Sequence, residues 1–71
     1  GANVFTAKSD EALRAISFIS NMENVNYELY VEIGGEQQKV ANGSVRYAGY
    51  KTVRLQNEIP LQEGEEFTVI L

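Results

Sequence analysis

Apolar and polar residues alternate along most of this chain, and this pattern predicts short β-strands joined by turns. The strongest alternation covers residues 27–33, where acidic side chains and Tyr30 stand between apolar ones. Successive side chains on a strand point to opposite faces, so one face of this strand is expected to be buried and the other solvated. The apolar face consists of Tyr27, Leu29, Val31 and Ile33. Gly34 and Gly35 accept the positive φ of a tight hairpin turn, which predicts a partner strand over residues 37–41.

Four other segments have the composition of strands, and turn-forming residues separate them. The predicted strands cover residues 4–7, 44–47, 50–56 and 67–71. In the segment 50–56, Val53 and Leu55 are expected to point inward. Turns or connections are predicted at residues 21–26, 42–43, 57–60 and 62–65, with a bend or bulge at residues 48–49.

The segment of residues 11–20 has two interpretations. Ala12, Leu13 and Ile16 fit one face of a helix, which Ser9 could cap. Alternation and the β-branched and aromatic residues around Phe18 favour a strand instead. We expect a strand from about Arg14 onward, and whether the segment begins as a helical turn stays open.

Several short strands with frequent turns predict an all-β fold, a small antiparallel β-sandwich of one domain. Phe5, Phe18 and Phe67 are expected in its core. A domain of 71 residues buries only about 60% of the surface of its unfolded chain, so its stability is small. The chain has no Cys and no His, which leaves apolar packing as the main source of stability.

Composition excludes several classes of function. Nucleophilic catalysis of the Ser-His or Cys-His kind and transition-metal sites need residues that the chain lacks, so we expect a non-enzymatic protein. The net charge is −4 and the six basic residues are scattered among carboxylates, which argues against nucleic acid as a partner. No apolar run approaches the roughly 20 residues of a membrane-spanning helix.

The carboxylates do not form a recognisable catalytic or metal site. Glu28 and Glu32 lie on one face of a strand roughly 13 Å apart, too far for either mechanism of glycoside hydrolysis. Calcium is the remaining metal alternative, because carboxylate and carbonyl oxygens bind it. Asp10 is the only Asp, and with Glu11 it could supply part of a calcium site. We therefore expect no cofactor, with calcium as the alternative.

Tyrosines are the remaining candidates for a binding site. Sugar-binding sites often stack an aromatic ring on the apolar face of a pyranose, with polar side chains binding the hydroxyl groups. Tyr30 is expected on the solvated face of its strand, and Tyr47 and Tyr50 bracket the bend at residues 48–49. These three tyrosines and Arg46 are the predicted ligand-binding residues. The alternative is that the tyrosines close the ends of a small core with their hydroxyls in water.

Four segments, taken in order, resemble one known domain family. They read ANVFTAKSDEALRAISF (2–18), NYELYV (26–31), YAGYKTVRL (47–55) and LQEGEEFTVIL (61–71). Together they resemble the lectin-like domain found beside the catalytic domain of bacterial and archaeal papain-like (C1-type) cysteine peptidases. The resemblance implies a lectin-like, jelly-roll-like sandwich. This chain departs from the family in lacking the flanking strands that are usual at the termini. The hairpin at Gly34 and Gly35 is also shorter than the loop expected there in that family.

The resemblance implies a non-catalytic accessory domain of a secreted bacterial peptidase, extracellular or at the cell surface. Its partners would be a cell-surface glycan or polymeric substrate and the neighbouring peptidase domain. Because the chain begins with Gly1, we interpret it as a module cut from a larger secreted protein, with Gly1 left by tag removal. The alternative function is structural, in which the domain packs against the peptidase or forms a homodimer. An unpaired edge strand from Phe67 to Leu71 would mediate the homodimer.

Overall fold

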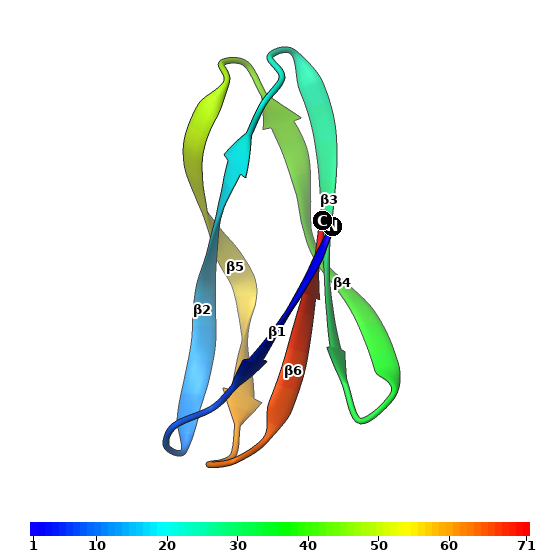
Figure 1. Ribbon diagram of the computed structural model, residues 1–71. Coiled ribbons are helices and arrows are strands. Elements are labelled where there is room, and N and C mark those ends of the chain that lie inside the picture. The colour runs from blue at the N-terminus through cyan, green and yellow to red at the C-terminus, as the bar shows by residue number, and fades with distance from the viewer.

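The computed structural model describes all 71 residues, and the chain folds into six strands without a helix (Figure 1). No segment therefore forms a helix long and apolar enough to cross a membrane. The strands are β1 (Ala2–Thr6), β2 (Glu11–Ser20), β3 (Val25–Ile33), β4 (Glu36–Val45), β5 (Gly49–Leu61) and β6 (Glu66–Ile70). The all-β prediction is confirmed.

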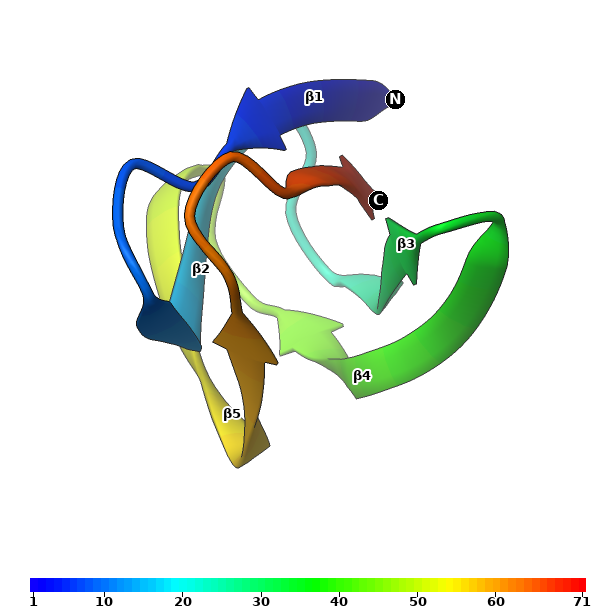
Figure 2. The same ribbon diagram turned by 90° about the horizontal axis from the view of Figure 1, so that it is seen from below.

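The strands form two antiparallel sheets that face each other as a small sandwich (Figure 2). The larger sheet has the order β1-β6-β3-β4, and the smaller sheet consists of β2 and β5. Strand β6 pairs with β1 on one side and with β3 on the other. The prediction of an unpaired edge strand from Phe67 to Leu71 is therefore wrong, because the N-terminal strand covers the edge that the sequence left open.

A small core lies between the sheets. Leu29 and Val31 of β3 are fully buried, as their alternation predicted. The buried cluster consists of Ala7, Ile16, Leu29, Val31, Ile59, Leu61 and Phe67. Phe18 packs against this cluster while partly buried. Phe5 is not in the core: it stays 48% exposed and stacks on Phe67 with 5.5 Å between ring centroids.

Strand β2 begins at Glu11, so the segment does not start as a helical turn. Its register with β5 shifts between Leu13 and Ala15. Such an irregularity resets the alternation of faces, so that Leu13 and Ile16, three residues apart, both contact the core. This shift explains why the spacing of apolar residues also fitted a helix.

Two segments that the sequence predicts as a turn and a connection lie inside continuous strands. Residues 42–43 lie inside β4, and residues 57–60 lie inside β5. Ile59 and Leu61 are buried and restore the inward alternation of β5, which keeps this part paired with the start of β2. A break in register still occurs nearby, because no residue from 55 to 58 pairs with β2.

The other predicted turns are present. Gly34 and Gly35 have φ of 59° and 83° and form the two-residue hairpin between β3 and β4. The turn that follows β2 is shorter than expected, because β3 already begins at Val25. Residues 62–65 turn into β6. The bend between β4 and β5 covers residues 46–48 and not 48–49, so the strand predicted over residues 44–47 ends at Val45.

Candidate ligand-binding groove

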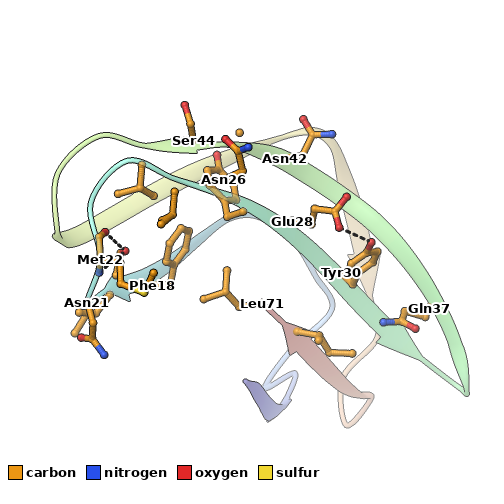
Figure 3. A pocket seen from close by; sticks show the side chains of 17 residues that line it. Phe18, Asn21, Met22, Asn26, Glu28, Tyr30, Gln37, Asn42, Ser44 and Leu71 are labelled. Carbon is orange, nitrogen blue, oxygen red and sulfur yellow. Dashed lines mark hydrogen bonds between the residues drawn. The ribbon is translucent and has the colours of Figure 1, made fainter.

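A broad groove of about 1170 Å³ runs along β3 and β4 (Figure 3). Its wall includes the end of β2, the turn at Asn21 and Met22, parts of β3 and β4, and Leu71 at the end of the chain. Charged side chains are nearly absent from this lining, and Glu28 is the exception. The groove therefore presents mainly amide, hydroxyl and aromatic groups.

Five polar or aromatic residues line the groove on one face of β3 and β4, and we call them the polar stripe. They are Asn26, Glu28 and Tyr30 of β3 and Asn42 and Ser44 of β4. The antiparallel register sets Asn26 opposite Ser44 and Glu28 opposite Asn42. Cross-strand partners have Cβ atoms about 5 Å apart, so these groups form one continuous surface. Figure 3 shows Asn26, Asn42 and Ser44 together, with Glu28 and Tyr30 further along β3.

A β-bulge in β4 organises one end of the polar stripe. Leu29 pairs with Ala41, but the next residue of β3, Tyr30, pairs with Lys39, which leaves Val40 as an extra residue. The extra residue lets Val40 and Ala41 both pack against the core although they are adjacent in sequence. It also brings Lys39 opposite Tyr30, within reach of Glu28.

Glu28 is held by two donors at this end. The Tyr30 hydroxyl donates to Oε1 of Glu28 at 3.2 Å, and Nζ of Lys39 donates to Oε2 at 3.2 Å. The Lys39 hydrogen bond, then the Tyr30 hydrogen bond and the Lys39 charge, keep the pKa of Glu28 below its usual value of 4.5. The carboxylate therefore stays ionised at neutral pH, and its hydrogen bond with the Tyr30 hydroxyl orients that side chain.

Apolar side chains form the other part of the groove. The rings of Phe18 and Tyr27 meet at a tilt with centroids 5.3 Å apart. Met22, which is 62% exposed, and Leu71 lie near them in the wall. The groove thus combines an apolar end with a row of hydrogen-bonding groups, which is the usual composition of sites for small polar ligands.

Of the four predicted ligand-binding residues, only Tyr30 lines this groove. Tyr50 lines a second hollow, which is formed mainly by β1, β2 and β6, and Arg46 and Tyr47 line neither hollow. Tyr47 and Tyr50 are 72% and 74% exposed, too open to close the ends of the core. The structure therefore does not bring the four residues into one site.

Sequence reasoning missed the amides of the polar stripe. The sequence predicts a turn at Asn26 because residues 21–26 contain three Asn, and at Asn42 because Asn42-Gly43 is a dipeptide that favours hairpins. Two features of the sequence could have identified them: Asn26 continues the alternation of Glu28 and Tyr30 backwards, and Asn42 stands two positions before Ser44. Both would have placed the residues on the solvated faces of paired strands.

The acidic residues considered for calcium have structural partners. Oδ1 of Asp10 accepts a hydrogen bond from the backbone N–H of Glu63 at 2.8 Å, which ties the loop before β2 to the turn before β6. Glu11 accepts a hydrogen bond from the Ser9 hydroxyl at 3.1 Å. No group of three or more His, Cys, Asp or Glu side chains is placed to hold a metal ion.

Comparison with known proteins gives one match. The lectin-like domain family matches residues 1–71, which is the whole chain. No curated protein and no solved structure matches the chain.

Proposed function

The chain belongs to the lectin-like domain family, and we propose that it binds carbohydrate through the polar stripe of the groove. The observation that carries this proposal is the register of β3 and β4, which lines up two amides, a hydroxyl, a carboxylate and a tyrosine on one open face. Family membership supports a carbohydrate ligand, although a shared fold does not by itself fix the function.

The chemistry of the polar stripe fits a saccharide. Each amide of Asn26 and Asn42 offers both donors and an acceptor, which suits vicinal hydroxyl groups that can donate and accept. Glu28 accepts hydrogen bonds from hydroxyls and keeps the Tyr30 phenol oriented. The partly exposed ring of Tyr30 is the group placed to stack on the apolar face of a pyranose. Because Glu28 is the one charged group in the wall, we expect neutral sugars to bind better than acidic ones.

Variants can separate this site from the exposed tyrosines. Asn42→Ala and Tyr30→Ala should each weaken binding to a glycan array or a cell-wall polysaccharide, since each removes a group of the polar stripe. Tyr47→Ala is the matched control, because this equally aromatic side chain lies outside the groove. Loss of binding in Tyr47→Ala or Tyr50→Ala, with Asn42→Ala unaffected, would instead place the ligand at the bend after β4. Circular dichroism of each variant checks the fold.

The wider role that we propose is an accessory domain of an extracellular bacterial papain-like cysteine peptidase. The support is the resemblance of the four segments described above, together with membership of the family. In this role the domain would hold the peptidase on a cell-surface glycan or a polymeric substrate and would contribute no catalytic residue. A fusion of this domain to such a peptidase should be retained on the insoluble polymer, and the Asn42→Ala fusion should be released.

A structural role is the second candidate, and the second hollow favours it. This hollow of about 610 Å³ is lined mainly by apolar residues of β1, β2 and β6, including Phe5 and Ile19. Ile19 is 68% exposed, so a neighbouring peptidase domain could cover it. Phe5→Ser should then weaken association with that domain without affecting glycan binding, because Phe5 lines this hollow and not the groove. The carbohydrate-binding proposal requires only the polar stripe.

A further inference from the structure

Strand β1 is an edge of the larger sheet, and all five of its residues are exposed. It pairs with β6 from Ala2 opposite Ile70 to Thr6 opposite Glu66, and no strand lies on its other side. Val4 is 61% exposed and Phe5 is 48% exposed. A row of free backbone groups and two large apolar side chains therefore lie together at this edge.

The hydrogen bonds at the two ends of β1 identify the free backbone groups. Gly1 exchanges hydrogen bonds with Leu71, and the N–H of Ala7 donates to the carbonyl of Glu65 at 2.9 Å. In an antiparallel pair, every second residue bonds to the partner strand. The odd-numbered residues of β1 therefore bond to β6, and the N–H and C=O groups of Ala2, Val4 and Thr6 point away from the sheet.

The other free edges carry features that discourage pairing with another chain, and β1 does not. Charged residues, proline and bulges are the usual protection of edge strands. Strand β2 has Arg14 at a register shift, β4 has Lys39 beside a bulge, and β5 has Pro60. Every strand except β1 contains at least one charged residue, whereas β1 reads ANVFT.

We propose that β1 pairs with β1 of a second copy of this chain. The two strands run antiparallel about a two-fold axis at Val4, with Ala2 of each copy opposite Thr6 of the other. This register pairs the free groups of Ala2, Val4 and Thr6 with one another and joins the larger sheets of both copies into one continuous sheet. Val4 packs on Val4 of the other copy, and Phe5 lies beside Asn3 on the opposite face.

The distribution of charge makes β1 a more favourable strand for pairing two copies than any other strand of the chain. Each copy carries a net charge of −4, so association is unfavourable wherever like charges meet. Pairing of β1 with β1 sets only uncharged side chains opposite each other. A contact of five residues per copy is smaller than a standard stable interface, so the dimer is expected to be weak and dependent on concentration.

Sedimentation equilibrium over a range of protein concentrations tests the proposal. The wild-type chain should shift from monomer to dimer as concentration rises. Val4→Lys should weaken dimerisation by about tenfold or more, because the two-fold axis sets two like charges opposite each other. Val4→Thr is the matched control, since it keeps a β-branched, uncharged side chain and should preserve the dimer. A wild-type chain that stays monomeric at its solubility limit would overturn the proposal.

Amide hydrogen exchange of the wild-type chain tests the register without any substitution. The amides of Val4 and Thr6 should exchange rapidly at low concentration and become protected as the dimer forms. The amides of Asn3 and Phe5 should be protected at every concentration, because they bond to β6. A dimer in which Val4 and Thr6 still exchange rapidly would show that another surface forms the contact, which would also overturn the proposal.

Discussion

Tyr27 covers Gly43 from the neighbouring strand, so closely that a side chain at Gly43 has no room. A Cβ built on Gly43 would lie 2.7 Å from the Tyr27 hydroxyl oxygen and 2.9 Å from Cζ of the ring. The two residues are cross-strand partners, and β4 is an edge strand. An aromatic ring that covers a strand glycine compensates for the missing side chain at that position. Gly43 thus belongs to the packing of the sheet and not to a turn.

Gly43→Ala should lower the free energy of unfolding by about 1–3 kcal/mol, because the Tyr27 ring, which also packs on Phe18, must shift to make room for the new methyl group. Urea denaturation measures the loss. Ser44→Ala is the control at an exposed neighbouring position and should change stability by less than about 0.5 kcal/mol. In a Tyr27→Leu background, Gly43→Ala should lower the free energy of unfolding by less than it does in the wild type. An equal loss in both backgrounds would contradict the contact between Tyr27 and Gly43.

The hairpin at Gly34 and Gly35 should depend on positive φ at both positions. Both glycines have φ in the left-handed region and open space around them, so backbone conformation alone limits substitution. Gly35→Ala should cost about 1–2 kcal/mol in unfolding free energy, whereas Gly34→Asn should be nearly neutral since Asn tolerates this conformation. A nearly neutral Gly35→Ala would show that the turn rearranges.

Much of the fold could be predicted from the sequence, because the buried face of β3 and the glycine hairpin are local patterns. The errors occurred where pairing between distant strands decides the structure. The alternation around Leu13 is reset by β5, and Ile59 becomes core only because β2 pairs with it. The protection of β6 by β1 is likewise a contact between the two ends of the chain. A short window of sequence contains no information on such partners.

Ile59→Ala should be strongly destabilising although sequence analysis placed this residue in a connection. Ile59 is 7% exposed and lies in the core cluster, so its truncation leaves a cavity and should cost about 2–5 kcal/mol. Since a domain of this size has little stability to spare, the variant is expected to be largely unfolded at room temperature. Thermal denaturation followed by circular dichroism measures the effect. Asn57→Ala, at an exposed position of the same strand, should have a midpoint close to that of the wild type.

The ionisation of Glu28 should give glycan binding a dependence on acidic pH. Its folded-state pKa lies below 4.5, so the stabilising contacts with Lys39 and Tyr30 are complete above that value and are lost as pH falls through the folded pKa. Binding should therefore be constant from neutral pH to about 4.5 and decline below it. An NMR titration of the Glu28 carboxyl carbon measures this pKa directly.

Removing a hydrogen-bond partner of Glu28 should raise the pKa of its carboxyl group. Lys39→Ala should raise the pKa of Glu28 more than Tyr30→Phe, because the Lys39 contact is the larger cause of its depression. Lys51→Ala is the control for general loss of positive charge, since Lys51 lies over Tyr27 and not at Glu28. An unchanged pKa in Lys39→Ala would contradict the ion pair.

The candidate site was less predictable than the fold. Tyr30 could be identified because the alternation of its own strand places it on the solvated face. Asn42 and Ser44 join it only through the register of β3 with β4, and the bulge at Val40 sets where Lys39 meets Glu28. The exposed tyrosines Tyr47 and Tyr50 stood out in the sequence, yet the fold separates them from the groove.

The most direct test of the central claim is an NMR titration of the ¹⁵N-labelled chain with neutral oligosaccharides from bacterial cell walls and plant polymers. If the groove binds carbohydrate, saturable shifts should appear at Asn26, Tyr30 and Asn42, and they should vanish in Asn42→Ala. Saturable shifts confined to Tyr47 and Tyr50, or no shift with any sugar from a folded sample, would contradict carbohydrate binding at the polar stripe.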